Sequence, residues 1–362
     1  MSGEALLGSE FTAFSAWLKA ALGADRRWHR LLYRQLMRSG RWEPEREPHW
    51  RAELPALARR AAELAEREQA PQIVERWQAS DPPYGVVEKF RLRLRDGAEV
   101  ETVSIPMAAD RHRTVCVSTQ VGCRQACAFC RTGQMGFVRN LTAAEIVGQV
   151  VAVDAATGRP ARNVVCMGMG EPLDNAEAVA QALRVLADRN GLSLAWSHLT
   201  VSTVGRLAGL ARWRALGLQR AQLAISLHAA DDELRAALIP SARLEPLAEL
   251  RRALAELPLP RQRRLLIAIT VIPGVTDAPA LLDRLCAWIS GLPALVNLIP
   301  YNPIPGRAWR APTAHEMLAL RDALDARGVP VRLRVTKGRA LLAACGQLAT
   351  AGRRAGADRM RA

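Results

Sequence analysis

Short apolar runs alternate with helix-length segments between residues 114 and 327 of this 362-residue chain, and this alternation constrains the fold most strongly. Strand-like runs lie at 114–119, 163–167, 199–203, 222–227, 265–271 and 296–299. Helical patterns lie at 143–156, 176–187, 247–257, 278–290 and 314–327. The alternation predicts a parallel α/β sheet, either a barrel or a doubly wound sheet. In both cases functional residues are expected in loops at the carboxyl ends of the strands.

The N-terminal part of the chain is predicted to be helical. Residues 12–77 show apolar positions at three- and four-residue spacing, with breaks near Gly40 and across 44–48. A helix would align four arginines on one face, beside Trp28 and Tyr33. These are Arg26, Arg30, Arg34 and Arg38. Such a stripe is usually a solvated helix face, and a phosphate-contacting face is the alternative.

Residues 85–105 predict a β-hairpin. Residues 86–94 and 100–105, on either side of Asp96 and Gly97, alternate between polar and apolar side chains or are rich in β-branched residues. An Asp-Gly pair between two such runs favours a tight turn.

The net charge lies mostly in the C-terminal part of the chain. The chain has 50 Lys and Arg against 35 Asp and Glu, a net charge of +15, and only +2 of it falls in residues 1–100. Such a charge attracts polyanions. The arginine excess itself is codon bias, because only Lys19, Lys89 and Lys337 are lysines. Residues 332–362 hold eight basic groups against Asp358, which predicts a basic tail that contacts phosphates.

Neither a membrane span nor a signal peptide is predicted. No run reaches the roughly 18 apolar residues that a spanning helix needs. Glu4 and Glu10 stand where a signal peptide would be cationic and then apolar. A cytoplasmic protein without membrane contact is therefore expected.

Seven cysteines indicate metal or redox chemistry, because an odd number argues against a disulfide framework. They are Cys116, Cys123, Cys127, Cys130, Cys166, Cys286 and Cys345. Cys123, Cys127 and Cys130 have CxxxCxxC spacing directly after the first predicted strand. Three thiolates suit an iron–sulfur cluster or zinc and leave one ligand position open for a substrate. The alternative is structural zinc completed by Cys116, His112 or Cys166.

The cysteine spacing, with Phe129 before the last cysteine, resembles the motif of the radical SAM superfamily. In that superfamily three cysteines hold one [4Fe–4S] cluster, and its fourth iron binds S-adenosylmethionine. The MGMGEP stretch at 167–172 resembles the element that meets the methionine amino group. Gly168 and Gly170 are expected to let the backbone approach that ligand closely.

Further blocks resemble the RlmN/Cfr family of RNA adenosine methyltransferases, in that family's order, across roughly residues 84–350. They read CVSTQVGC (116–123), GFVRNLT (136–142), MGMGEPL (167–173), VSTVG (201–205), SLHA (226–229), IPYNPIP (299–305) and AACGQL (343–348). Such a set is far more specific than CxxxCxxC alone.

The resemblance implies a partial (β/α)6 barrel with a small helical N-terminal domain and a basic C-terminal tail. The expected divisions are a helical RNA-docking domain at 1–80, a β-hairpin linker at 81–108, the radical SAM core at 109–340, and the catalytic-cysteine segment with the tail at 341–362. A monomer is expected.

The resemblance also implies a mechanism with two S-adenosylmethionine molecules per turnover. One methylates Cys345, and a radical made from the second removes a hydrogen from that methyl group, whose carbon then bonds to an electrophilic adenine ring carbon. Cys116 would attack the Cys345 sulfur, release the methylated base and leave a transient disulfide. Glu101 matches the position of the base that removes the ring proton.

The same resemblance assigns the remaining site residues and partners. The S-adenosylmethionine contacts would be Gly170, Glu171, Ser202, Ser226, Leu227, His228 and Asn302. The expected substrate is ribosomal RNA, with transfer RNA as a second one. The expected electron donor is a protein such as flavodoxin or ferredoxin. Cys166 and Cys286 match no role and are expected to be buried apolar residues.

One stretch departs from the family pattern. The approach to Cys345, residues 337–343, holds no acidic residue where the family usually has several. The resemblance implies methylation of adenine C2, and this departure leaves another RNA or adenine C8 as alternatives. Two further alternatives are a radical enzyme with another substrate and, in a different class, a nonenzymatic RNA-binding protein with structural zinc.

Overall fold

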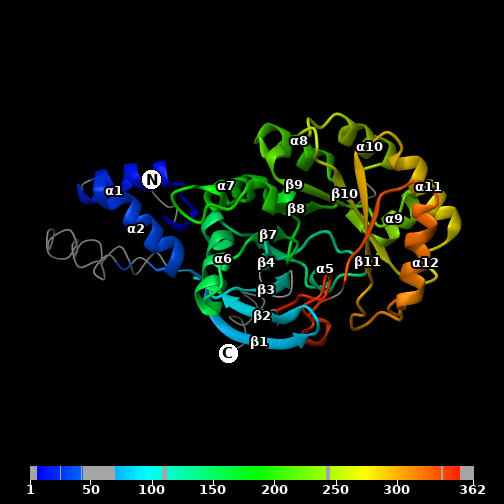
Figure 1. The fold of residues 1–362 in the computed structure, drawn as a ribbon, viewed down its shortest axis with the longest axis horizontal. Helices are drawn as coiled ribbons and strands as arrows, with labels where there is room; N and C mark the ends of the chain where they lie inside the picture. Colours follow the sequence, from blue (N-terminus) through cyan, green and yellow to red (C-terminus); the bar gives the residue numbers. More distant parts are fainter. Residues whose placement is uncertain are drawn as a thin grey trace, which may run out of the picture.

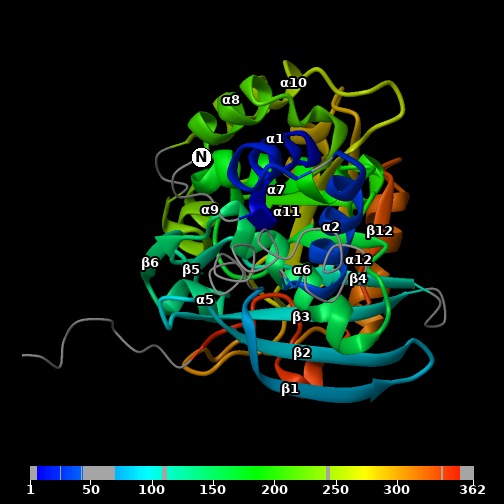
Figure 2. The same ribbon diagram turned by 90° about the vertical axis from the view of Figure 1, so that its left-hand side faces the viewer.

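The computed structural model describes residues 6–24, 26–41, 43, 70–107, 112–241, 245–335 and 337–350. Their main feature is a curved ten-stranded sheet in the order β1-β2-β3-β4-β7-β8-β9-β10-β11-β12, drawn from two directions in Figures 1 and 2. Its strands are β1 (Gln72–Asp81), β2 (Gly85–Arg93), β3 (Glu99–Met107), β4 (His112–Cys116), β7 (Asn163–Cys166), β8 (Leu199–Thr203), β9 (Gln222–Ser226), β10 (Leu265–Val271), β11 (Ala294–Pro300) and β12 (Val331–Leu333). A separate pair is formed by β5 (Gln120–Gly122) and β6 (Phe137–Asn140).

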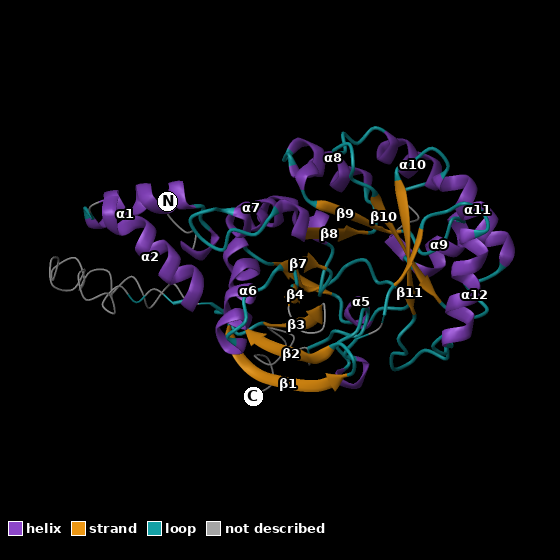
Figure 3. Ribbon diagram, viewed as in Figure 1, coloured by secondary structure: helices purple, strands orange, loops and turns teal. Residues whose placement is uncertain are grey.

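Most of the helices lie along the outside of the parallel part of this sheet, while α1 and α2 lie to one side of it (Figure 3). They are α1 (Phe11–Leu22), α2 (Arg26–Ser39), α5 (Arg131–Gln134), α6 (Ala143–Thr157), α7 (Ala176–Ala187), α8 (Leu207–Ala215), α9 (Asp232–Leu238), α10 (Leu247–Ala255), α11 (Pro279–Ile289) and α12 (Ala314–Asp325). Short 3-10 helices are η1 (Leu6–Gly8), η3 (Pro172–Asn175), η4 (Trp196–His198), η5 (Leu218–Arg220) and η7 (Arg339–Leu341). Within the described residues no helix is long and apolar enough to cross a membrane.

The parallel strands form a partial barrel, as expected. β4 and β7 to β12 pair in parallel, and their spatial order follows the chain order without a reversal. A doubly wound sheet would show such a reversal, so this alternative is excluded. All six predicted strands are confirmed, and their carboxyl ends face the same rim of the barrel.

The predicted hairpin is confirmed, but it is part of the main sheet instead of a linker. β2 and β3 pair across the turn at Asp96 and Gly97, and β3 pairs in turn with β4. The helical interpretation of residues 72–77 is wrong, because these residues belong to β1, which pairs antiparallel with β2. Backbone pairing along nearly the whole of β2 decides the conformation there, where the local pattern is ambiguous.

The N-terminal helices pack beside the barrel, with η1 and α2 against α6. The four arginines of the stripe are exposed on α2, as expected. Trp28 and Tyr33 are buried, so they lie on the other face of α2 and do not flank the arginines. Residues 44–69, which belong to the helical prediction, and residues 351–362, which hold four of the eight basic groups of the tail, lie outside the described residues.

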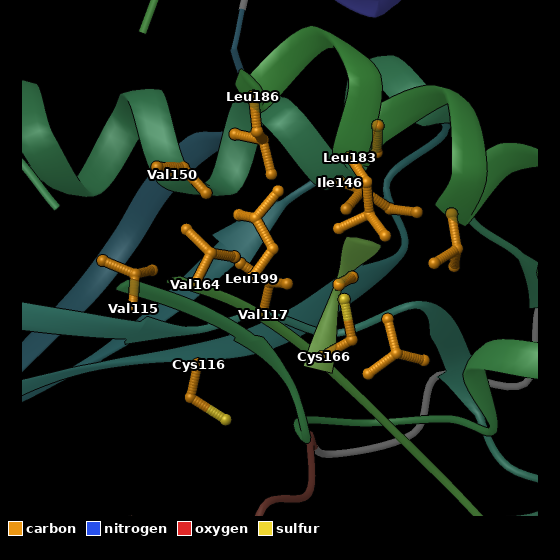
Figure 4. Close-up of a cluster of buried hydrophobic side chains, with 14 of the residues drawn as sticks. Val115, Cys116, Val117, Ile146, Val150, Val164, Cys166, Leu183, Leu186 and Leu199 are labelled. Atoms are coloured by element: carbon orange, nitrogen blue, oxygen red, sulfur yellow. The ribbon is translucent and has the colours of Figure 1, made fainter. Parts of the chain in front are cut away.

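A hydrophobic core fills the space between the sheet and α6 and α7. Figure 4 shows the Cys166 side chain among these apolar groups, near Ile146 and Leu183, and the Cys116 side chain on the opposite side of the sheet. The register explains this, because Cys116 lies beside Val165, and successive residues of a strand point to opposite faces. Cys166 is therefore a core residue, as expected, while Cys116 faces the site.

Candidate active site

The three motif cysteines lie on one loop between β5 and α5. The loop begins where the Cys123 amide donates to the Gly136 carbonyl at 2.8 Å. Gly122 makes this close approach possible, since a Cβ there would lie 1.9 Å from the same carbonyl oxygen. A turn then brings the Cys130 amide to the Cys127 carbonyl at 3.1 Å. The chain thus folds so that three sulfurs are gathered on one short loop.

The surroundings of these thiols favour a soft metal cluster. Burial raises the pKa of Cys123 to about 12 and raises that of Cys127 and Cys130, and the neighbouring cysteines raise the first two further. Thiols that are close together and desolvated gain most from a bound cation that stabilises the thiolate form. The donor set, three thiolates and no fourth protein ligand on the loop, fits a [4Fe–4S] cluster with one free iron.

Two of the three residues named for the zinc alternative do not complete a fourth position. His112 is exposed at the start of β4, the end of the strand away from the cysteine loop. Cys166 points into the hydrophobic core.

Glu171 connects the ends of β7 and β8. Its carboxylate accepts hydrogen bonds from the amides of Leu173 (3.0 Å) and Val204 (2.9 Å). Burial nevertheless raises the pKa of Glu171 to about 7. Both carboxylate oxygens are bonded to backbone amides, so the Glu171 side chain fixes the loops at the rim of the barrel. A ligand here would contact the neighbouring backbone instead of the carboxylate.

The close approach predicted for Gly168 and Gly170 is made by protein. A Cβ on Gly168 would lie 2.7 Å from the Val117 carbonyl oxygen. A Cβ on Gly170 would lie 2.6 Å from the Gln120 Cβ and 2.8 Å from its amide nitrogen. These glycines therefore have a packing reason that sequence alone did not reveal, and the approach of a ligand to their backbone stays a prediction.

Gly170→Ala is expected to destabilise the protein by about 3 kcal/mol, because φ is +105° and the new Cβ would overlap Gln120. The matched control is Gly158→Ala at the end of α6, where φ is +66° and no atom lies within 4 Å. That change is expected to cost only about 1 kcal/mol. Chemical denaturation measures both. Equal losses would contradict the packing explanation.

Residues at the ends of β8 and β9 surround the cysteine loop. The Ser202 and Ser226 hydroxyls lie 3.1 Å apart. The His228 ring packs edge-on against Phe129 of the cysteine loop, with centroids 4.5 Å apart. Its Nδ1 accepts a hydrogen bond from the Thr270 amide, so Nε2 carries the proton of the neutral ring. Burial lowers the pKa of His228 to about 3, so the ring is uncharged at neutral pH.

Leu227 and Asn302 differ in what they could offer a ligand. Leu227 is fully buried, and its amide is bonded within the barrel. Asn302 donates through Nδ2 to the Cys345 carbonyl at 3.2 Å, while its buried Oδ1 has no partner. A buried acceptor without a donor is rare, so Asn302 Oδ1 fits a ligand that donates a hydrogen bond. This observation supports the predicted S-adenosylmethionine site.

The segment around Cys345 lies against the cysteine loop and α5. The Gly346 carbonyl accepts from the Arg131 amide at 2.7 Å, and the Leu348 carbonyl accepts from the Thr132 hydroxyl at 2.5 Å. A Cβ on Gly346 would lie 3.0 Å from the Phe129 carbonyl oxygen. The fold therefore brings together two motifs that are more than two hundred residues apart in sequence.

Cys345 also lies close to Cys116. Burial raises the pKa of Cys116 to about 12, and the nearby Cys345 thiol raises it further, while the Arg334 guanidinium and a hydrogen bond from the Met167 backbone lower it. Cys345 raises the pKa of Cys130 in the same way. All seven cysteines are free thiols in this structure, so the predicted disulfide is not present. Cys286 is half-buried on α11, away from these groups.

Glu101 lies on β3 at the edge of this site. Its Oε1 is 2.8 Å from Lys89 Nζ, and its Oε2 accepts a hydrogen bond from the Ala349 amide at 2.9 Å. Burial raises the pKa of Glu101, and Lys89 and Arg131 oppose that shift. Sequence reasoning missed Lys89 and Arg334, for which no motif gives a signal. The predicted pairing of β2 with β3 is the one clue that Lys89 lies near Glu101.

Comparisons with known proteins agree with this geometry. Residues 117–285 match the family model of the Radical SAM superfamily. The dual-specificity RNA methyltransferase RlmN of Syntrophobacter fumaroxidans is 44% identical over 264 residues, which cover 72% of this chain and 75% of the relative. The protein of the same name from Sorangium cellulosum is 42% identical over 298 residues, covering 73% and 77%.

A solved structure is similar along nearly the whole chain. It is a radical SAM methyltransferase from Sphaerobacter thermophilus, with a TM-score of 0.83 and 35% sequence identity, and the match covers 95% of this chain and 98% of that one. Identity at this level over most of both chains, together with the cysteine loop, excludes a nonenzymatic zinc protein. This chain belongs to the RlmN family of radical SAM RNA methyltransferases.

Proposed function

We propose that this protein methylates C2 of an adenine in ribosomal RNA, and also in transfer RNA, as the dual-specificity name of its relatives suggests. One observation carries the proposal: Cys345 lies beside both Cys116 and Cys130, on a segment bonded to the cysteine loop. The proposal includes a cytoplasmic monomer and a flavodoxin or ferredoxin as electron donor. The net charge of +15 supports an RNA substrate.

The chemistry explains why two cysteines are needed beyond the cluster ligands. An adenine ring carbon such as C2 is electrophilic, so direct methyl transfer from S-adenosylmethionine does not reach it. When bound, the cluster and two molecules of S-adenosylmethionine supply the methyl group and the radical that activates it. The protein supplies Cys345 as the methyl carrier, and Asn302 fixes that residue through its carbonyl.

Release of the base is assigned to Cys116 and Glu101. Glu101 accepts the ring proton after the radical has added, and the one electron released with it would return to the cluster. As a thiolate, Cys116 bonds to the Cys345 sulfur and breaks the bond between that sulfur and the transferred carbon, which leaves with the electron pair and takes up a proton to become the methyl group. The resulting disulfide between Cys116 and Cys345 is returned to two thiols by a dithiol reductant, which restores the state seen in this structure.

Expression of this protein in a bacterium that lacks adenine C2 methylation is expected to produce 2-methyladenosine in RNA. Nucleoside mass spectrometry of ribosomal and transfer RNA, digested separately, measures the product and its distribution. A Cys123→Ala variant, which loses one cluster ligand, is the control and is expected to give none. Finding 8-methyladenosine would support the alternative ring carbon, and finding neither would contradict the proposal.

A further inference from the structure

Lys89 is a buried lysine at the edge of the active site. It is only 5% exposed on β2. Its ammonium lies 2.8 Å from Glu101 Oε1, donates to the Leu342 carbonyl at 3.3 Å and lies 5.4 Å from the centre of the Trp77 ring. A buried ammonium is costly unless it is paired and hydrogen-bonded, so its position is fixed by these partners.

The Lys89–Glu101 pair contacts the chain on both sides of Cys345. Lys89 bonds the carbonyl of Leu342, three residues before the cysteine. Glu101 bonds the amide of Ala349, four residues after it. We call residues 342–349 the Cys345 segment. One ion pair therefore holds both of its ends.

The sheet register places this pair on the face that carries Cys116. Lys89 lies opposite Val103 on β3, and Val103 lies opposite Cys116 on β4. Residues directly opposite one another in antiparallel strands point to the same face. Lys89 is thus in one row with Cys116 across three strands, and the ion pair draws the Cys345 segment toward that row.

The Cys345 segment begins with a strained residue. Leu342 has φ of +50°, in the left-handed region that non-glycine residues rarely adopt, although its side chain is 41% exposed. Such a conformation persists where surrounding contacts hold it. The hydrogen bond from Lys89 to the Leu342 carbonyl is one contact that holds Leu342 in this conformation.

We propose that Lys89 is a positioning residue which, through Glu101 and the Leu342 carbonyl, clamps both ends of the Cys345 segment and holds Cys345 beside Cys116. The clamp rests on the proposed function in that Cys345 carries the methyl group and Cys116 releases it. Lys89 touches neither cysteine, so it acts through the backbone of the segment and through the charge of Glu101.

Lys89→Met removes the ammonium and keeps the length of the side chain. In the cluster-containing enzyme, hydrogen exchange at the amides of residues 342–349 is expected to rise about tenfold or more, the effect of losing a charged hydrogen bond. The kcat for RNA methylation is expected to fall by a similar factor with KM for RNA unchanged. The acid limb of the pH–rate profile should move to higher pH, because the pKa of Glu101 rises when Lys89 is lost and only the Ala349 amide and Arg131 still oppose the effect of burial.

The matched control is Glu88→Gln on the same strand. Glu88 is also buried, but it lies on the opposite face and pairs with Arg76 and Arg113. It is expected to lower thermal stability without changing exchange in the Cys345 segment or the kcat. If both variants raise that exchange equally, the effect is general loosening and the clamp is overturned.

A double variant keeps the test valid if Lys89→Met alone fails to fold. In the double variant Lys89→Met/Glu101→Gln no unpaired carboxylate is buried, and exchange in the Cys345 segment is still expected to rise. Unchanged exchange in either variant would overturn the clamp. Failure of the wild-type enzyme to make any methyladenosine would instead contradict the proposed function. The exchange measurement would still test whether Lys89 holds the Cys345 segment.

Discussion

Replacing Cys116 with alanine is expected to stop the reaction after RNA has become joined to Cys345, so that a covalent protein–RNA complex accumulates. Cys116 lies beside Cys345 on the site face of β4 and is assigned to neither the cluster nor the methyl group. Without it the bond between the Cys345 sulfur and the base persists. Release of methylated RNA should fall on the order of ten-thousandfold, as for other residues that act as one unit.

The complex is measured by denaturing electrophoresis with labelled RNA and by mass spectrometry of the peptide that contains Cys345. The control is Cys166→Ala on the neighbouring strand β7, whose side chain faces the hydrophobic core (Figure 4). It is expected to lose about 1 kcal/mol of stability and to release product without a trapped complex. A Cys116→Ala enzyme that turns over, or a Cys166→Ala enzyme that traps RNA, would contradict the assignment.

The barrel could be predicted from the sequence, but β1 could not. Each barrel strand is a short apolar run, because helices cover one face and the site covers the other. Residues 72–81 include Glu75, Arg76 and Gln78, and no residue of this strand, which lies at the edge of the sheet, is fully buried. A local pattern of that kind fits a helix as well as a strand, and only the pairing with β2 decides between them.

The site was predictable where chemistry fixes the spacing of residues. Three cysteines on one loop reveal a cluster site, and the block around Cys345 reveals a second reactive thiol. Lys89 has no such signal, because its partners Glu101 and Leu342 come from another strand and from the far end of the chain. The packing reason for Gly170 could not be predicted, since its close neighbour Gln120 becomes visible only in three dimensions.

Cys345→Ala is expected to abolish methylation while leaving the fold intact. The contacts that hold the Cys345 segment involve its backbone: the Cys345 carbonyl accepts from Asn302, and the Gly346 carbonyl accepts from the Arg131 amide. Alanine keeps these hydrogen bonds, so the melting temperature should change little. The methyl carrier is lost, so RNA methylation should fall on the order of ten-thousandfold or more.

Two measurements separate this loss of the carrier from a general defect. After incubation with S-adenosylmethionine, the wild-type protein is expected to gain one methyl group by intact-protein mass spectrometry, and Cys345→Ala none. Cys286→Ala on α11 is the control and should behave as wild type, because Cys286 is not one of the site cysteines and lies away from them. Methyl uptake by Cys345→Ala at another residue would contradict the role of Cys345. Normal uptake followed by no RNA product in the wild type would place the failure in the RNA substrate instead, because the residues that load the methyl group would then be shown to work.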